Sequence, residues 1–354
     1  MIKISTQLSP LCFLPSGKLV CYRSGELVLM TGVSEEICYP ILNSKIEKLI
    51  SRSKIVSRLL RVGIRTAVAI DDNKILLSKG NMLYEFDLHN SKLSKGFLLG
   101  IGIRPLIFTS VKNLIGFDNT IFFGEYLSNK NKKPVNIYKR VGVDKWDIAY
   151  TFPQGAINHV HNIISDPYRK CLWIFTGDFD DAAAIWKVTD NFNNVKRVLY
   201  NKQNYRACVA FPVKQGLLYA TDSPFTENHI YLMKDDLSLK KILKIDGSSI
   251  YGCQCGDKYV FSSTVEADGR NQSLLKLMFS KKIGAGITDK FVRLYTGNLE
   301  KGFEVIYKEK KDCLPFIFQF GVFRFPYGEN TSNKLYFQPV ATNKNDLVLM
   351  RLEV

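Results

Sequence analysis

Short runs of apolar residues alternate with turn-forming residues along most of the chain. Lys18–Tyr22 is followed closely by Glu26–Met30, and the same arrangement recurs at Cys171–Phe175 and Ala184–Val188. Runs of this length, divided by turns rather than by helical segments, are typical of antiparallel strands. The pattern therefore predicts an all-β protein built from repeated hairpins.

The hairpins group into units of four strands. The units begin near residues 11, 65, 105, 157, 205, 249 and 315, and the spacing of about 40 to 60 residues is that of β-propeller blades. We therefore predict one propeller domain over residues 1–354, with six or seven blades and seven favoured. The last unit has three strands of its own, so Ile2–Ser5 is expected to supply the fourth and close the ring.

One segment breaks the strand pattern. Residues 43–61 contain no glycine or proline, and they place apolar residues such as Leu59 and Leu60 among lysines and arginines. This distribution predicts a short amphipathic helix, or two turns, packed on the disc.

The net charge adds an expectation about partners. The chain has 49 Lys and Arg against 33 Asp and Glu, a formal charge of +16, which favours an anionic partner unless it serves only to keep the surface soluble. An acidic oligo- or polysaccharide would be such an anionic partner. Nucleic acid is not expected, because no helix-turn-helix, zinc-finger or RNA-binding signature is present. We also expect a cytoplasmic protein without a transmembrane segment, since neither a secretory signal nor a long apolar span is found.

The strongest candidate for chemistry is a histidine pair. His159 and His161, two of only four histidines, are two residues apart on a predicted strand and project to the same face. Both imidazoles can then meet one ligand, one proton-transfer site or one divalent metal ion, the only cofactor that these residues suggest. A metal ion would need a third ligand, expected from another blade. The alternative is a hydrogen-bonded pair that stabilises its own blade.

Acidic residues follow several apolar strands. Loops at strand ends converge on the central channel of a propeller, so these carboxylates are candidates for acid–base catalysis. Asp178 can also hold a histidine in place. An acidic residue directly after an apolar strand can instead belong to a turn or to an ion pair between blades, and this is the alternative to a catalytic role. The candidates are Glu125, Asp178, Asp222 and Glu266.

A second set of polar residues is predicted to bind substrate. Arg206 leads directly into the apolar run Cys208–Phe211, where an unpaired guanidinium would be costly. It therefore needs a carboxylate, supplied either by the protein or by an acidic ligand. The other candidates for substrate binding are Tyr126, Asn228 and Gln319.

Several short motifs along the chain resemble those of one family. They are Phe123–Tyr126, Asn136–Lys139, Trp146, His159–His161, Asp166–Tyr168, Trp173–Asp178, Thr221–Ser223, Ser263–Glu266 and Lys311–Asp312. With these motifs the chain, from about Arg58 to its end, resembles the sialidase-like, BNR-repeat β-propeller proteins of bacteria, which are associated with surface-polysaccharide functions. The sequence departs from true sialidases because Gly142–Trp146 is only a degenerate Asp-box turn. Of the three arginines that sialidases need, Arg206 is the clearest candidate, and Arg65 and Arg104 are weaker ones.

The resemblance implies a carbohydrate-active propeller. Our leading hypothesis is a glycoside hydrolase or polysaccharide lyase that acts on an acidic bacterial glycan. The alternative is a non-catalytic propeller that binds a glycan or scaffolds polysaccharide-assembly proteins, because a fold does not fix a function.

Overall fold

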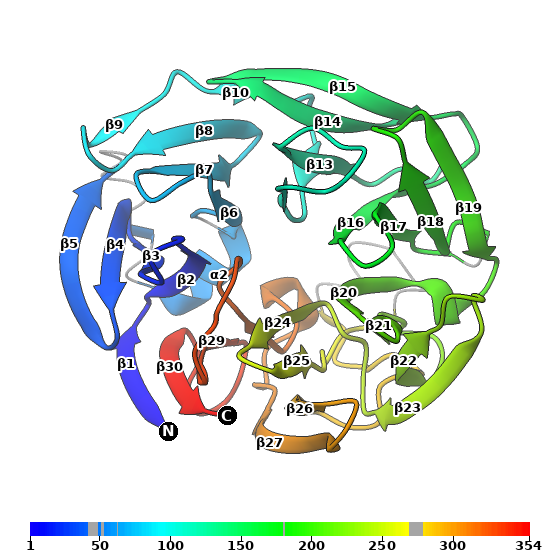
Figure 1. Ribbon diagram of the computed structural model, residues 1–354. Helices are drawn as coiled ribbons and strands as arrows, with labels where there is room; N and C mark the ends of the chain where they lie inside the picture. The colour runs from blue at the N-terminus through cyan, green and yellow to red at the C-terminus, as the bar shows by residue number, and fades with distance from the viewer. Residues whose placement is uncertain (42–48, 51–52, 62, 180, 269–278) are drawn as a thin grey trace.

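The strands form a ring of blades around a central axis (Figure 1). The computed structural model describes residues 1–41, 49–50, 53–61, 63–179, 181–268 and 279–354. Within these ranges the strands make seven antiparallel sheets. The all-β propeller predicted from the sequence is therefore confirmed, with seven blades rather than six.

The first four blades are formed by consecutive strands. Blade one contains β2 (Ser9–Phe13), β3 (Leu19–Arg23), β4 (Glu26–Thr31) and β5 (Ser34–Pro40). Blade two contains β6 (Thr66–Ala69), β7 (Lys74–Lys79) and β8 (Met82–Asp87), with β9 (Lys92–Leu93) and β10 (Phe97–Leu98) both paired to β8. Blade three contains β11 (Arg104–Pro105), β12 (Thr109–Val111), β13 (Thr120–Tyr126), β14 (Val135–Gly142) and β15 (Lys145–Phe152). Blade four contains β16 (His159–Asp166), β17 (Cys171–Gly177), β18 (Ala184–Thr189) and β19 (Asn194–Tyr200).

The remaining three blades complete the ring. Blade five contains β20 (Ala207–Val213), β21 (Gly216–Thr221), β22 (Asn228–Met233) and β23 (Leu239–Ile245). Blade six contains β24 (Tyr251–Cys255), β25 (Lys258–Ser262), β26 (Phe291–Asn298) and β27 (Gly302–Lys310). Blade seven contains β28 (Val322–Arg324), β29 (Lys334–Val340) and β30 (Val348–Glu353), together with β1 (Ile2–Thr6).

Blade seven joins the two ends of the described chain. Strand β1 pairs antiparallel with β30, from Ile2 opposite Arg351 to Thr6 opposite Val348, and the two termini lie close together in Figure 1. This pairing confirms that the N-terminal strand closes the ring. It also covers the edge of β30, which would otherwise expose unpaired backbone groups.

Apolar contacts between neighbouring blades hold the ring together. All seven residues of β17 are buried, and Trp173 and Phe175 belong to one apolar cluster with Leu217 and Tyr219 of the next blade. Burial of both faces explains why these middle strands read as continuous apolar runs instead of alternating ones. The outer strands, such as β19, alternate between partly and fully exposed positions.

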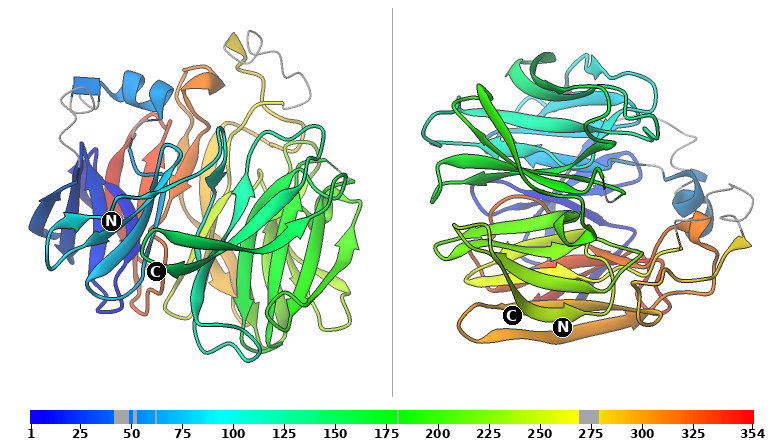
Figure 2. Two further views of the ribbon diagram at one scale, coloured as in Figure 1. Left: turned by 90° about the horizontal axis from the view of Figure 1, so that it is seen from above. Right: turned by 90° about the vertical axis from the view of Figure 1, so that its right-hand side faces the viewer.

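A short helix, α2 (Lys54–Leu60), lies against one face of the disc (Figure 2). The helix begins at Ser53, whose hydroxyl accepts a hydrogen bond from the Val56 amide. Its buried Arg58 donates to the Phe318 carbonyl at 2.9 Å and forms ion pairs with Asp312 and Asp346 at 2.5 and 3.2 Å. The helix is therefore held to the disc by a buried charge network.

The predicted helical insertion is confirmed only over residues 54–60, since residues 42–48 and 51–52 lie outside the described residues. The expected apolar packing is wrong for its last turn. Leu59 and Leu60 are 41% and 54% exposed, whereas Arg58 is 3% exposed. The cationic side chain faces the disc because two carboxylates there neutralise it. No described helix is long and apolar enough to cross a membrane.

The closing strand gives a prediction about stability. Deletion of residues 1–6 removes the backbone pairing between β1 and β30. Each such hydrogen bond contributes about 1 kcal/mol, so we expect the free energy of unfolding to fall by about 2–4 kcal/mol. Urea unfolding would measure the loss, and size-exclusion chromatography would detect association through the exposed edge. The double substitution Ile2→Val and Ile4→Val, which keeps the strand, should behave like the wild type. Equal stability of the truncated and complete chains would contradict the role of this strand.

Candidate functional site

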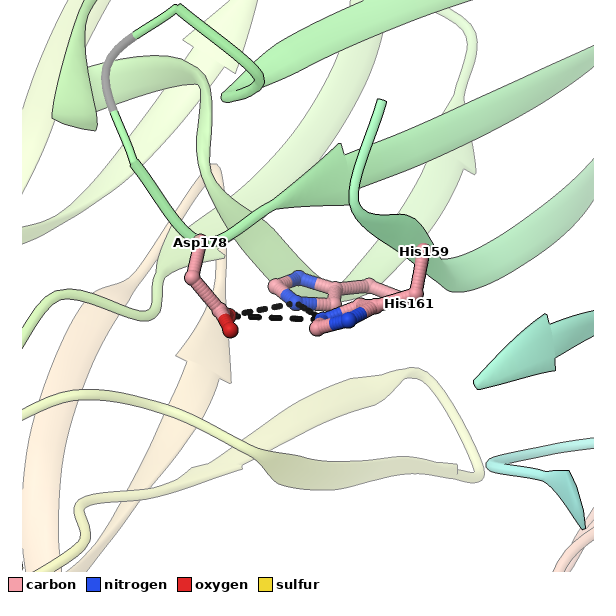
Figure 3. Close-up of side chains that lie close together, drawn as sticks. All are labelled: His159, His161 and Asp178. Carbon is pink, nitrogen blue, oxygen red and sulfur yellow. Dashed lines mark hydrogen bonds and ion pairs between the residues drawn. The ribbon is translucent and has the colours of Figure 1, made fainter. Parts of the chain in front are cut away.

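Two histidines and an aspartate meet at the channel-facing end of blade four (Figure 3). His159 and His161 lie on the innermost strand β16 and are buried. Asp178 follows the end of β17, where Gly177 pairs with His159. The two Nε2 atoms are 3.1 Å apart, and the Asp178 Oδ1 lies 3.4 Å from the Nε2 of His159 and 3.3 Å from that of His161. Both rings thus reach one carboxylate, as predicted for the histidines, although the register of β16 against β17 shifts between Val160 and Asn162.

Backbone carbonyls fix the orientation of both imidazole rings. The Nδ1 of His159 lies 2.9 Å from the Leu127 oxygen, and the Nδ1 of His161 lies 3.2 Å from the Ala207 oxygen. A carbonyl only accepts hydrogen bonds, so each Nδ1 carries the proton and donates it. In the neutral form, each Nε2 then presents a lone pair. Burial, more than any other influence, lowers the pKa of His159, which favours this neutral form.

Gly177 leaves the space that one of these rings fills. A Cβ atom at this position would lie 2.5 Å from the Cε1 of His161. A side chain of any size would therefore push the imidazole away from Asp178. The glycine is needed here for close approach, since its φ does not lie in the left-handed region.

Arg206 connects Asp178 to a second carboxylate in the next blade. Its Nη2 lies 3.1 Å from the Asp178 Oδ1, and its Nε lies 3.5 Å from the Asp222 Oδ2. Burial alone would lower the pKa of Arg206, but the charges of Asp222 and Asp178 outweigh burial and raise it. Burial likewise works to raise the pKa of Asp178, yet its contacts with the histidines and Arg206 hold that pKa well below its usual range. The carboxylates that Arg206 needs are therefore supplied by the protein itself.

Glu266 lies in the same polar centre and behaves differently from the two aspartates. It is buried, and its carboxylate accepts a short hydrogen bond from the Ser248 hydroxyl. Burial, together with the negative charge of Asp222, raises the pKa of Glu266 to about 8. The side chain is thus protonated at neutral pH and can act as a proton donor.

Tyr126 links this centre to a group of arginines. Its ring centroid lies 4.4 Å from that of His159, and the guanidinium of Arg104 lies 5.0 Å from the same tyrosine ring. Burial, and then the nearby charge of Asp178, raises the pKa of Tyr126. The phenol consequently keeps its proton between the arginines and the histidines.

Four arginines, which we call the arginine cluster, lie close enough together for their charges to affect one another: Arg61, Arg65, Arg104 and Arg324. Desolvation by the surrounding protein, followed by the mutual repulsion of these charges, lowers the pKa values of Arg61 and Arg65. Arg324 donates a hydrogen bond to the Gln319 side chain at 3.2 Å. In the described part of the chain, none of the four forms an ion pair with a carboxylate. Such a cluster can bind anions.

Three of the residues predicted from the sequence lie apart from the histidine–aspartate centre. The carboxylate of Glu125 accepts hydrogen bonds from the Asn136 amide at 2.8 Å and from the Tyr138 hydroxyl at 3.2 Å. Asn228 bonds within its own loop, to Thr221 and Ser223 among others. Gln319 contacts Arg324 and the backbone of the α2 helix. Glu125 thus bonds within its own blade, Asn228 also donates to the Gly286 carbonyl of blade six at 3.1 Å, and Gln319 belongs with the arginine cluster.

Only part of the arginine cluster is predicted from the sequence. Arg65 and Arg104 are weak candidates in the sequence. Arg65 directly precedes strand β6 and Arg104 begins strand β11, and this position at the start of an inner strand is the sequence signal that could identify them. Arg61 and Arg324 are not predicted. Arg61 follows the last residue of a helix and Arg324 is the last residue of a strand. The two arginines share no sequence motif from which their proximity in the fold could be predicted. The sequence analysis expects a third metal ligand from another blade. The residue that lies beside the two histidines, Asp178, instead belongs to the same blade, blade four.

The raised pKa of Glu266 predicts a pH dependence of stability. Between the ordinary value of 4.5 and about 8, the folded protein holds a proton that the unfolded chain releases. Rising pH across this window should therefore lower the free energy of unfolding, by up to about 1.4 kcal/mol per pH unit. In Glu266→Gln this loss should be absent, as urea unfolding from about pH 5 to about pH 8 would show. Glu304→Gln, which removes an exposed carboxylate, serves as the control and should follow the wild type. Parallel curves for Glu266→Gln and the wild type would contradict the raised pKa.

Comparisons with known proteins establish the architecture. No family model matches the sequence, and no curated protein matches it in sequence. Among solved structures, an oligogalacturonate lyase from Vibrio parahaemolyticus is similar with a TM-score of 0.55 and 13% identity, over 88% of this chain and 82% of the lyase. A chain of the Mitotic Checkpoint Complex gives a TM-score of 0.57 at 8% identity, over 100% of this chain and 93% of the other.

A third similar structure is the β-propeller domain of Cps50 (Swd1) from Myceliophteria thermophila, with a TM-score of 0.55 and 8% identity over 100% of this chain and 98% of that domain. At these identities the likeness concerns the fold and not the activity. The matches include both an enzyme and a component of a protein assembly, so they do not distinguish a catalytic from a non-catalytic role. What they support is the fold, which in this chain is a seven-bladed propeller.

Proposed function

We propose that this protein binds an acidic glycan at the arginine cluster and cleaves it by β-elimination. The observation that carries the proposal is the cluster itself, whose four guanidinium groups meet no described carboxylate. Guanidinium groups bind carboxylates in a planar, two-point geometry. Carboxylates of uronate residues would neutralise these charges, and the exposed positions of Arg61 and Arg65 leave them open to a ligand.

The neighbouring polar groups favour elimination over hydrolysis. A glycosidase uses a pair of carboxyl groups on either side of the bond that breaks. Here Asp178 and Asp222 both contact Arg206, so neither is free to serve in such a pair. In β-elimination, binding of the uronate carboxylate by cations eases removal of the proton on the neighbouring carbon, and solvent water takes up this proton as the base. A C=C bond forms as the C–O bond to the leaving group breaks, and a proton donor protonates the leaving oxygen. Tyr126, which keeps its proton beside Arg104, suits the donor role.

The structural likeness to an oligogalacturonate lyase gives this proposal a precedent in the fold. That lyase is one of several similar propellers, and its identity to this chain is 13%. The support from likeness is therefore limited to the ability of such a ring to carry a lyase site. The arginines of this chain, and not the likeness, favour a uronate substrate.

Binding without cleavage is the second candidate function. It is favoured by the same contacts of Asp178 and Asp222 with Arg206, because they engage two carboxylates of the centre that catalysis would otherwise use. A protein of this kind would hold an acidic glycan for polysaccharide-assembly proteins. It would bind the glycan through the same arginine cluster but would release no product.

Substitutions in the arginine cluster test the proposal. Arg65→Gln and Arg104→Gln each remove one positive charge and keep a polar side chain. We expect each to weaken the binding of oligogalacturonate or another uronate oligosaccharide by about tenfold or more, because a charge-assisted hydrogen bond contributes about 1.5–3 kcal/mol. Calorimetry would measure binding, and the ultraviolet absorbance of the unsaturated uronate product would report elimination.

Arg23→Gln is the matched control, because Arg23 is already paired with Glu35 at 2.7 Å in another blade. It should bind the oligosaccharide like the wild type. A neutral oligosaccharide of equal length should bind to none of the proteins. Cleavage by the wild type supports a lyase, and binding without product supports the second candidate. If no uronate oligosaccharide binds, or if both cluster variants bind as tightly as the wild type, the proposed site is wrong.

A further inference from the structure

We propose that His159, His161 and Asp178 form a binding site for a divalent transition-metal ion. Metal binding at this centre goes beyond glycan binding and does not depend on it. The Nε2 atoms of both histidines and the Oδ1 of Asp178 lie within 3.4 Å of one another, and each can act as a metal ligand. In Figure 3 the two rings and the carboxylate point toward a common centre.

The hydrogen bonds of the two rings leave this centre rich in lone pairs. Both Nδ1 atoms donate to the backbone carbonyls of Leu127 and Ala207, so both Nε2 atoms are acceptors in neutral imidazole. The Asp178 Oδ1 is also an acceptor. In this form three lone-pair atoms lie within 3.4 Å of one another, and of the three only the Asp178 Oδ1 has a cationic partner, the Arg206 Nη2 at 3.1 Å. A single proton can bridge only two of them, whereas a metal ion can contact all three.

The separations between these atoms agree with metal coordination. Zinc binds imidazole nitrogen and carboxylate oxygen at about 2.0–2.2 Å, and ligands at that distance in a tetrahedron lie about 3.4 Å apart. The three observed separations are 3.1, 3.3 and 3.4 Å. The side chains thus already have the spacing that a bound ion requires.

The surroundings of the three side chains support the same conclusion. Histidines that bind metals commonly donate their other ring nitrogen to a carbonyl, which fixes the ring, and both histidines do so here. Arg206 orients Asp178 through its side chain at 3.1 Å and its backbone oxygen at 3.0 Å.

The ligand set also indicates which ion the site prefers. Two imidazoles with one carboxylate suit ions such as Zn²⁺, Mn²⁺ or Fe²⁺, whereas Ca²⁺ and Mg²⁺ prefer oxygen ligands alone. Three protein ligands leave a coordination position open, as in catalytic metal sites. The Asp178 side chain is 32% exposed, so an ion can reach the centre from solvent.

Metal titration of the full-length protein tests the site. After treatment with a chelator, the protein is titrated with Zn²⁺ or Mn²⁺ by calorimetry, and the bound metal is counted by elemental analysis. We expect one ion per chain in the wild type. His161→Gln and Asp178→Asn, which remove one ligand each, should weaken binding by about 100-fold. Co²⁺ should give the visible absorption of a low-coordinate site in the wild type and lose it in the variants.

His229→Gln provides the matched control, since His229 is another buried histidine, on β22 of blade five. It should bind the metal like the wild type. Circular dichroism and thermal unfolding establish that each variant is folded. Should His161→Gln fail to fold, Asp178→Asn at the partly exposed end of the strand still decides the question. The proposal is overturned if the wild type binds neither ion, or if Asp178→Asn binds it as tightly as the wild type.

The outcomes separate this site from the proposed glycan site. Metal binding is measured with no glycan present, and the arginine substitutions leave all three ligands in place. Loss of uronate binding in those variants with retained metal binding would support both assignments. Metal binding without any uronate binding would support the metal site and reject the glycan site.

Discussion

The buried guanidinium of Arg206 holds the polar centre of this propeller together. It contacts the carboxylate of Asp178 in blade four and that of Asp222 in blade five. The buried carboxylate of Asp222 and the partly exposed one of Asp178 would repel each other, and the arginine between them compensates this repulsion. Glu266, which meets the charge of Asp222 with less compensation, keeps its proton instead. Together with the two histidines, Arg206 thus favours the ionised form of Asp178.

The architecture was predictable because it depends on a pattern repeated around the ring. Each unit carries the same order of apolar runs and turns, so errors in single strands do not change the result. The closing role of Ile2–Ser5 follows from a simple count, since the last unit lacks one strand. Burial of both faces of the middle strands explains the continuous apolar runs, such as that of β17.

The site was predictable only where local geometry decides it. The spacing of His159 and His161 fixes their common face on any strand, and Asp178 ends the adjacent strand. Arg61 and Arg324 depend on contacts between distant segments, which no local pattern encodes. The carboxylate of Glu125 points to Asn136 and Tyr138 of its own blade. Its position after an apolar strand resembles that of Asp222, but the facing direction of a side chain at a strand end depends on the local twist and register.

The closure of blade seven has a consequence for the order of folding. Strand β1 is synthesised more than 340 residues before its partner β30. The first six blades can pair their own strands as they emerge. Strand β1 remains without its partner until β30 has been synthesised, so the ring closes last. The contact that closes it has the greatest separation along the sequence. Such long-range contacts form slowly, and this makes the final blade the step at which two growing chains in proximity can exchange their first strands.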